Sequence, residues 1–410
     1  MGSPMLWHLG AEYDCIATAL RSGRGFADPF YVQSGPTAWM PPVMPCILAS
    51  FYWLCGDDRN GVIVLFTCLQ GLSISLTIAM VLSEAQRIGR YWFGIVIVAI
   101  GISVNYDSLF QITHDHGILL GVVAAIYFLL VKAQHQATRS TAVVQGFCGG
   151  FAALCSPICG LVWASGLSMF QWKRLRWVMI AGATSVLVIS PWMIRNRLAL
   201  GRWVPIKSAG KFEVYFSMVV DDDGIVDMNS FQQHPWLVDN DTRALYAKLG
   251  ESAFIDHFDP QIREKVMQEP MDCVSRIANR FLSATILWQP LLVDQHSEWF
   301  IVIRSVVFAF PFYGLLVVLF KSKDRRCMRE SVAAHIYIAG LLPYIAITYY
   351  ERHGIPLIGI KMLLVLYGFE TFLGSRSEPV DRDGGGQEAV GLESQQLLNQ
   401  VDGFRIDNST

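Results

Sequence analysis

Long apolar runs separated by short polar turns restrict what this chain can fold into. A helix needs about 20 predominantly apolar residues to cross the hydrocarbon of a bilayer. Only 16% of the residues are charged, against about 25% in ordinary soluble domains. We therefore expect an all-α polytopic membrane protein. Its apolar runs lie at 61–83, 92–110, 116–132, 141–170, 177–193, 298–320, 331–350 and 355–373.

Positive charge is concentrated in four short loops, and this bias predicts orientation because short cytoplasmic loops collect lysine and arginine. The run 141–170 then begins and ends in the cytoplasm, so we expect it to cross twice, as a hairpin broken at Ser156-Pro157. About nine transmembrane helices result. The basic loops contain Arg87 and Arg90; Lys132 and Arg139; Lys173, Arg174 and Arg176; and Lys321, Lys323, Arg325, Arg326 and Arg329.

This topology divides the chain into five parts. We expect an outer-face loop with juxtamembrane helices, transmembrane helices, a small mainly helical outer-face insert, further transmembrane helices, and a disordered cytoplasmic tail. The span at 177–193 should end at Ser190-Pro191-Trp192, and the insert should contain helices near 241–256 and 259–284. The five parts cover residues 1–60, 61–193, 194–297, 298–374 and 375–410.

The N-terminus is expected on the outer face, yet residues 1–9 lack the basic and apolar regions of a signal peptide. We expect an upstream apolar segment to be missing, through truncation or a misassigned start. The alternative is that the N-terminus crosses the membrane unaided.

Nine cysteines occur without C-x-x-C spacing, so we infer neither a disulfide framework nor a zinc site. His114, Asp115 and His116 could hold a metal only with a third ligand from elsewhere. We expect no metal and no other cofactor, since the sequence gives a divalent cation no support. The chain also has no basic face of the kind that a nucleic-acid partner needs.

Two acidic residues, Glu12 and Asp14, stand at the head of a short amphipathic helix with Ile16 and Leu20 on its apolar side. The surrounding segment, residues 10–42, is too polar to span a bilayer. A carboxylate pair held just outside a membrane is a candidate site for chemistry. The simpler alternative is that both are solvated residues interacting with a helix N-terminus.

The predicted topology gathers further polar side chains on the same face. Arginine and lysine can hold a phosphate whose lipid tail stays in the bilayer, and a carboxylate can take the proton from an attacking hydroxyl. Sugar transfer from a lipid phosphate needs both. The gathered residues are Asp107, His114, Asp115, His116, Arg195, Arg197, Lys207, Lys211, Arg352 and His353.

Several of these residues also have a purely structural interpretation. Asp115 at a helix start would be an N-terminal cap or a dipole partner. Arg195 and Arg197 at the end of a span would be interface anchors. Arg352 would be an end residue whose charge reaches toward water.

Four motifs, in order, resemble bacterial GT-C membrane glycosyltransferases, relatives of the protein O-mannosyltransferases and of the aminoarabinose transferase acting on lipid A. The resemblance covers residues 10–375. The first motif is Glu12-x-x-x-Ile16-Ala17, Gly23-Arg24-Gly25-Phe26, Asp28-Pro29-Phe30, Gly35-Pro36-Thr37-Ala38-Trp39 and Pro41-Pro42. The others are Ser190-Pro191-Trp192-Met193-Ile194-Arg195-Asn196-Arg197 with Gly201-Arg202-Trp203; His234-Pro235 with Gly250-Glu251, Arg280-Phe281-Leu282 and Trp288; and Glu351-Arg352-His353-Gly354-Ile355-Pro356.

The resemblance implies a catalytic first loop and an inverting transfer of a hexosyl or pentosyl group from a polyprenyl-phosphate donor. The acceptor would be a glycan, a lipid or a protein. The enzyme would lie in the bacterial inner membrane, with its active site on the periplasmic face. Glu12 would be the general base, with Asp14 as a second candidate.

The same resemblance implies that Arg352 meets the donor phosphate, with Arg195, Arg197 and Lys207 as helpers. A second acidic site would include Asp107 or Asp115 together with His114 and His116. Three features depart from the family pattern: its first transmembrane helix is absent, His353 replaces a tyrosine, and His114-Asp115-His116 replaces an acidic motif.

Two other function classes stay open at the level of sequence. One is a transporter or flippase, although ionisable residues gather outside the spans rather than within them. The other is a noncatalytic or truncated protein of envelope assembly. The identity of the sugar and acceptor and the oligomeric state cannot be read from the sequence.

Overall fold

The computed structural model describes residues 10–110, 115–134, 138–237, 241–290, 296–321 and 327–373. Internal contacts divide the chain into two units, Met1–Phe369 and Glu370–Thr410. The site and the helices discussed below belong to the first unit, apart from the last four residues of the final helix. The predicted tail, 375–410, lies outside the described residues.

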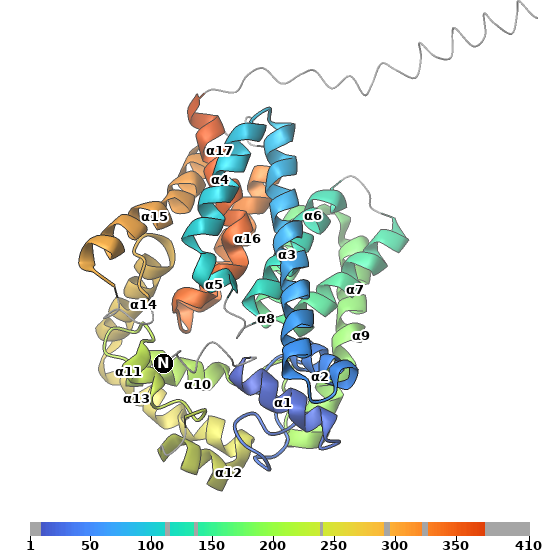
Figure 1. Cartoon of the computed structure of the whole chain (residues 1–410), viewed down its shortest axis with the longest axis vertical. Coiled ribbons are helices and arrows are strands. Elements are labelled where there is room, and N and C mark those ends of the chain that lie inside the picture. Colours follow the sequence, from blue (N-terminus) through green and yellow to red (C-terminus); the bar gives the residue numbers. More distant parts are fainter. Residues whose placement is uncertain are drawn as a thin grey trace, which may run out of the picture. The chain divides into compact units, whose positions relative to one another are not determined.

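Helices make up almost all of the regular structure (Figure 1). Within the described ranges there is no strand, and the only β-type pairings are isolated bridges between Ala27 and Pro36 and between Ile225 and Tyr349. The first helices are α1 (Ala11–Arg21), α2 (Val43–Cys55), α3 (Arg59–Arg87), α4 (Tyr91–Val104), α5 (Tyr106–Phe110), α6 (His116–Ala133), α7 (Arg139–Cys155), α8 (Pro157–Gln171) and α9 (Leu175–Leu200), with the short η2 (Trp172–Arg174) before α9.

The second half of the chain is built in the same way. The insert supplies α10 (Gly210–Tyr215), the π-helical η3 (Phe216–Val220), α11 (Met228–Phe231), α12 (Asp241–His257), α13 (Asp259–Gln268) and α14 (Pro270–Thr285). The C-terminal helices are α15 (Glu298–Phe320), α16 (Met328–Ala346), the 3-10 helix η6 (Glu351–Leu357) and α17 (Ile358–Leu373).

Five helical stretches in the described residues are long and apolar enough to cross a membrane, and they confirm the predicted all-α polytopic membrane protein. Two shorter apolar helices, α2 and α4, accompany them. The predicted total of about nine spans stays a prediction. The five stretches are Arg59–Arg87, His116–Ala133, Pro157–Leu200, Glu298–Phe320 and Glu351–Leu373.

The run 141–170 forms two helices that meet at Ser156, as its proline predicts. Ser156 is extended, with φ −158° and ψ 130°, and Pro157 occupies the first turn of α8. A Cβ at Gly149 would lie 2.3 Å from the ring of Trp163. Glycine therefore allows α7 and α8 to pack closely against each other.

The predicted helix end at Ser190-Pro191-Trp192 is wrong, because α9 continues through Pro191 to Leu200. Proline has no N–H to give to the carbonyl of Leu187. The hydroxyl of Ser190 donates to that carbonyl over 2.9 Å. A hydroxyl group thus replaces the missing backbone donor.

The insert contains the first predicted helix, α12, with a kink at Gly250. The second prediction, one helix over 259–284, is corrected to two, α13 and α14. Glu269 between them has φ −129° and ψ 57°, which is not helical. The residue before a proline is disfavoured in the α region, so Pro270 explains the break.

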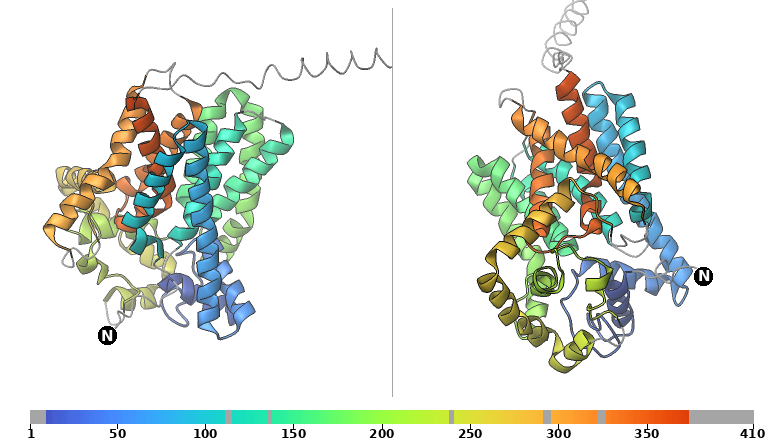
Figure 2. Two further views of the ribbon diagram at one scale, coloured as in Figure 1. Left: turned by 45° about the horizontal axis from the view of Figure 1, so that its top comes forward. Right: turned by 90° about the vertical axis from the view of Figure 1, so that its left-hand side faces the viewer.

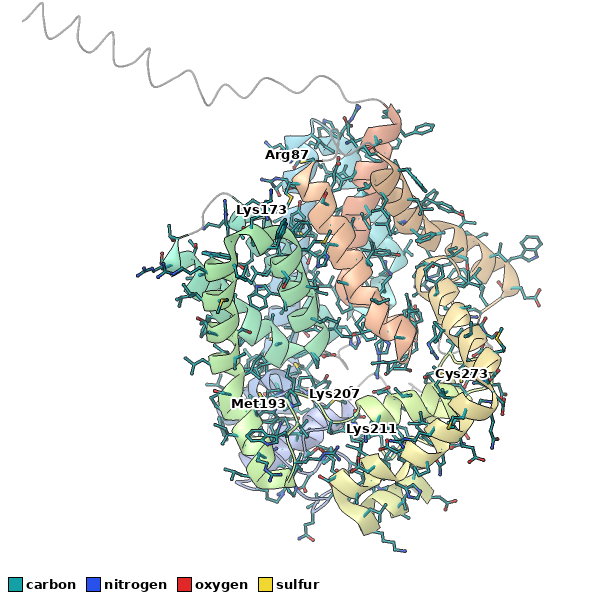
Figure 3. All side chains as sticks on the ribbon, turned by 180° about the vertical axis from the view of Figure 1, so that it is seen from behind. Arg87, Lys173, Met193, Lys207, Lys211 and Cys273 are labelled. Atoms are coloured by element: carbon teal, nitrogen blue, oxygen red, sulfur yellow. The ribbon has the colours of Figure 1, made fainter. Side chains whose placement is uncertain are left out.

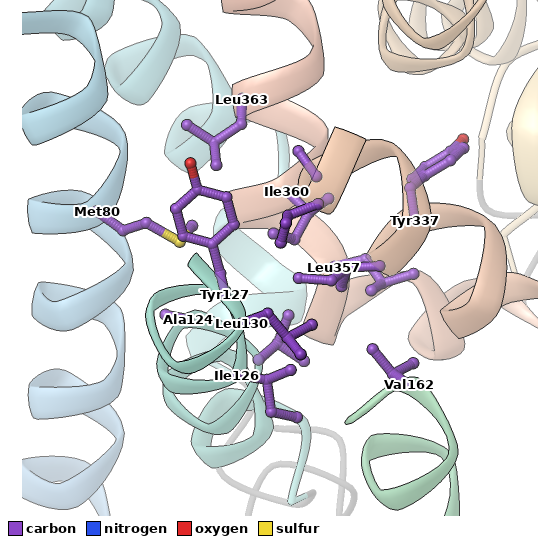
Figure 4. Packing of buried hydrophobic residues seen from close by; sticks show 14 of the residues in the cluster. Met80, Ala124, Ile126, Tyr127, Leu130, Val162, Tyr337, Leu357, Ile360 and Leu363 are labelled. Atoms are coloured by element: carbon purple, nitrogen blue, oxygen red, sulfur yellow. The ribbon is translucent and has the colours of Figure 1, made fainter. Parts of the chain in front are cut away.

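Buried apolar side chains hold the spans together (Figure 4). Met80 of α3, Tyr127 of α6, Val162 of α8, Tyr337 of α16 and Leu363 of α17 meet in this core. Because five helices contribute, their ends are fixed relative to one another.

Two of the predicted cytoplasmic loops meet through an ion pair. Glu84 is buried near the end of α3, and its carboxylate lies 2.8 Å from Nε of Arg87 and also pairs with Arg329 at the start of α16. Elsewhere, Arg174 donates to the carbonyl of Ala133 over 3.1 Å and joins two more of these loops.

The basic loops and the insert lie at different ends of the first unit. Figure 3 shows Arg87 and Lys173 at one end, with Lys207 and Lys211 toward the other. At the second end, α1, α2 and the insert helices lie together (Figure 2) and share a second hydrophobic cluster. Lys207 and Lys211, which were predicted for one face of the membrane, therefore lie toward the end opposite Arg87 and Lys173 (Figure 3).

Labelling of added cysteines should reveal which end faces the medium. Loop charge predicts that Lys173 is cytoplasmic and that Lys248, on α12, is outside. A membrane-impermeant maleimide added to intact cells should therefore label Lys248→Cys, and not Lys173→Cys, above the parent chain. Both side chains are exposed, so burial cannot explain a difference. Labelling of Lys173→Cys alone would show that the protein has the opposite orientation to the one predicted.

Candidate functional site

Glu12 is carried by the first turn of α1, which begins after a left-handed Gly10 with φ 70°. The buried side of α1 includes Tyr13, Ile16 and Ala17, which pack in the second hydrophobic cluster. This packing fixes the rotation of the helix. Glu12 consequently lies in the interior, with 13% of its side chain exposed.

A cavity of about 340 Å³ lies between the first loop, the insert and the ends of α6, α8 and α16. Its charged or titratable lining comes from six separate parts of the chain. Its remaining lining is mostly apolar or aromatic. The charged or titratable members are Glu12, Tyr13, Asp115, His116, Lys207, Glu213, His234, Tyr344, Tyr350, Arg352 and His353.

Opposite charges meet in this cavity. Burial raises the pKa of Glu12 above its ordinary value; Arg352 and Lys207, with the backbone of Glu12, counteract that effect, and Glu213 adds to it. Lys207 Nζ lies 3.3 Å from Oε1 of Glu213. Arg352 donates to the hydroxyl of Tyr350, and its guanidinium lies 4.4 Å from the centre of that ring. The cavity can thus hold an anion beside a carboxylate.

His234 connects the insert to Glu12. Its Nε2 lies 3.6 Å from Oε1 of Glu12, and its Nδ1 accepts the backbone N–H of Trp236 over 3.2 Å. Phe231 stacks on the imidazole with centroids 5.0 Å apart. Burial lowers the pKa of His234 to about 3, so the ring is neutral near pH 7.

Asp115 faces the cavity instead of capping α6. It occupies the N-cap position, but its side chain makes no capping hydrogen bond. The hydroxyl of Tyr13 donates to its Oδ2 over 2.8 Å, and Nδ1 of His116 lies 3.0 Å from its Oδ1. Asp115 is therefore not a side-chain cap, although its place at the helix start still suits a dipole partner; Asp115 and His116 do join Glu12 around one cavity.

Asp14 is directed away from the cavity. The hydroxyl of Tyr52 donates to its Oδ1 over 2.5 Å, and Arg59 Nη2 lies 3.1 Å from its Oδ2. These contacts join α1 to α2 and α3. The structure thus gives Asp14 a bracing role in the first loop.

Arg195 and Arg197 also lie outside the cavity lining. Arg195 donates to the carbonyls of Thr37 and Phe26, and its guanidinium lies 5.1 Å from the centre of the Trp192 ring. Arg197 donates to the carbonyl of Gly201 at the end of α9. Both arginines satisfy backbone carbonyls. The side chain of Asp107 and all of His114 fall outside the described residues.

The anchor of the first loop is Glu251, for which no local sequence pattern predicts such a role. Its carboxylate accepts from the hydroxyls of Thr37, Ser208 and Tyr246 and from the backbone N–H of Ala38. Thr37 and Glu251 are 214 positions apart. Glu251 and His234 both occur in the third motif of the resemblance, which implies no role for either residue.

No cluster of three histidine, cysteine, aspartate or glutamate residues suited to a metal occurs among the described residues. The pairing of Asp115 with His116 and Tyr13 involves two candidate ligands only.

No protein-family model matches the sequence, and no curated protein matches it. Two solved structures of ArnT from Cupriavidus metallidurans are similar, one in the apo state and one bound to undecaprenyl phosphate. The identity is 14% in both cases, and the TM-scores are 0.34 and 0.33. The alignments cover 89% and 90% of this chain and 74% of each ArnT chain. Similarity this low extends no activity to the present chain.

Replacing Glu251 with alanine should lower the Tm of the purified protein, because four donors lose their common acceptor. Each buried donor left unsatisfied costs about 1–3 kcal/mol. Glu213→Ala is the matched control; it removes one partly exposed ion pair and should cost less than about 1 kcal/mol. Thermal unfolding in detergent measures both. Equal Tm values for the two variants would contradict the anchoring role.

Proposed function

We propose that this protein is a glycosyltransferase of the bacterial inner membrane that uses a polyprenyl-phosphate sugar donor on the periplasmic face. The observation that carries the proposal is the meeting of Glu12 and Arg352 at one cavity. A base for the acceptor and a cation for the donor phosphate are the two groups that this reaction requires.

The cavity has the polarity of a lipid phosphate. Arg352 and Lys207 provide positive charge, and guanidinium groups suit phosphate through paired hydrogen bonds. The wall formed by α8 and the end of α16 is apolar apart from Tyr344, and it includes Ile158, Leu161 and Pro343. Leu161 lines the cavity and is 49% exposed. The hydrocarbon chain can therefore leave the cavity between α8 and α16 and enter the bilayer.

The proposed reaction is a single displacement. The carboxylate of Glu12 takes the proton of an acceptor hydroxyl as its oxygen attacks the anomeric carbon of the sugar. The bond between that carbon and the phosphate oxygen breaks, and polyprenyl phosphate leaves with the electron pair. Arg352 and Lys207 stabilise its charge. Attack opposite the leaving phosphate inverts the configuration of the sugar.

His234 suits a positioning role beside Glu12. A neutral imidazole has one N–H and one acceptor nitrogen. Because Trp236 donates to Nδ1, the proton is on Nε2, the nitrogen that faces Glu12. At 3.6 Å this N–H is not hydrogen-bonded to Glu12, but its dipole beside the carboxylate favours the ionised form.

Glu12→Gln should abolish glycan transfer in cells while the protein still inserts into membranes. The amide keeps the shape of the side chain but cannot take a proton, and general bases contribute about 10²–10⁴-fold to rates. Asp14→Asn is the matched control, since Asp14 lies on the same helix and contacts only bracing residues described above. Mass spectrometry of cell-envelope glycans from complemented deletion cells measures transfer. Unchanged glycans with Glu12→Gln would reject Glu12 as the base.

Lys207→Met should move the acidic limb of the pH–rate profile to higher pH. Glu12 acts when ionised, so the rate falls as pH drops through its pKa, which burial already raises. Removing the positive charge of Lys207 raises this pKa further, against the remaining effects of Arg352 and Glu213. Transfer rates in isolated membranes provide the profile.

Lys211→Met is the control for this shift. Lys211 pairs with Asp256 and Asp259 and does not line the cavity, so its loss should leave the limb in place. A limb that moves to lower pH in Lys207→Met, or that moves equally in both variants, would contradict the proposed ionisation of Glu12.

A further inference from the structure

Helix α14 has an inverted distribution of polarity for a helix at an aqueous surface. Its two arginines, Arg276 and Arg280, are 7% and 0% exposed, whereas Met271 and Val274 are 76% and 56% exposed. A helix on a water-facing surface normally turns its charged side outward. On α14 the apolar side is outside.

Buried partners explain why the arginines face inward. Arg280 donates to the carbonyls of Ile345 and Ala346, at the end of α16, over 2.7 Å and 3.3 Å. Arg276 donates to the carbonyl of Asp221 and to a carboxylate oxygen of Asp272, the latter over 2.6 Å. These bonds fix the rotation of α14 against the rest of the unit.

No charged residue lies on the outward side of α14 beyond its first turn. The exposed residues of this lipid-like face are apolar or small; we name this set the α14 outer face. It consists of Met271, Val274, Ser275, Ile277, Ala278, Phe281 and Leu282.

The α14 outer face is continuous with the apolar exterior of α15, one of the five stretches long and apolar enough to cross a membrane. Phe281 of α14 meets Phe312 of α15 edge to face, with centroids 5.7 Å apart. Val302, Ile303 and Val306 of α15 are all more than half exposed. Figure 1 shows α14 and α15 as successive helices on the same side of the unit.

Charges mark where the apolar face stops. Before α14, Lys265 lies 2.6 Å from Glu269 and 2.9 Å from Asp272, and α13 exposes Arg263 and Glu264. The boundary between water and hydrocarbon therefore falls near the start of α14. With 16 residues, α14 is about 24 Å long, too short to cross hydrocarbon of about 30 Å.

We propose that α14 is embedded in the membrane leaflet on the cavity side, with its outer face against lipid acyl chains. The carboxyl-terminal part of the insert is then a membrane element and not part of a water-surrounded domain. This embedding holds the α16 end, and so the residues that follow it around the cavity, at a fixed depth through Arg280. The inference does not depend on the proposed transfer reaction.

A photoreactive benzophenone amino acid at Val274 of the full-length protein, illuminated in native membranes, tests this location. Mass spectrometry should find adducts with lipid acyl chains at Val274 and none at Lys248, an exposed position of α12. A cross-linked dimer through Val274 would assign the face to a second copy. Equal lipid adducts at both positions, or none at Val274, would also overturn the inference.

A pair of charge substitutions tests the membrane location of α14 without cross-linking. Val274→Asp puts a carboxylate in hydrocarbon and should reduce the yield of folded protein from membranes several-fold. Ala247→Asp, at an exposed position of α12, should leave the yield unchanged. Equal yields of the two variants would contradict the embedding of α14.

Discussion

This structure depends on one constraint: positively and negatively charged side chains are buried around the same cavity. A buried carboxylate or guanidinium without a partner is strongly destabilising, and each group here lies near an opposite charge. Glu12 is influenced by Arg352 and Lys207. Because these residues come from α1, the insert and the start of η6, the fold must bring three distant segments together to satisfy them.

The acids of the first loop and the insert divide into those that hold these segments together and those that face the cavity. Glu251 binds the first loop to the insert through four donors, and Asp14 joins α1 to Tyr52 and Arg59. Glu12 has fewer fixed partners and faces space that a ligand can fill. Precise positioning of reactants requires a rigid frame around the few side chains that have few protein partners and can contact the ligand.

Sequence patterns predicted the elements more successfully than their contacts. Apolar length identified the spans, and Ser156-Pro157 identified the break between α7 and α8. The same proline rule failed at Pro191, because a serine hydroxyl one position earlier satisfied the freed carbonyl. The rule concerns the backbone N–H that proline lacks, and it cannot predict which side chain will donate to the carbonyl instead.

At the candidate site, too, the sequence predicted where residues lie better than it predicted their contacts. Loop charge placed Glu12, Asp115, His116, Lys207 and Arg352 on one face, and they line one cavity. It also grouped Asp14 and Arg195 with them, since topology gives the face of a residue but not the direction of its side chain. Glu251 and His234 join the first loop from more than 200 positions away, and no local pattern reports such partners.

A structure of the full-length protein with polyprenyl phosphate bound would test the central claim most directly. The account predicts phosphate oxygens within about 3 Å of the Arg352 guanidinium and an isoprenoid chain that leaves between α8 and α16. Phosphate bound away from Arg352, or a lipid that avoids the Glu12 cavity, would contradict it.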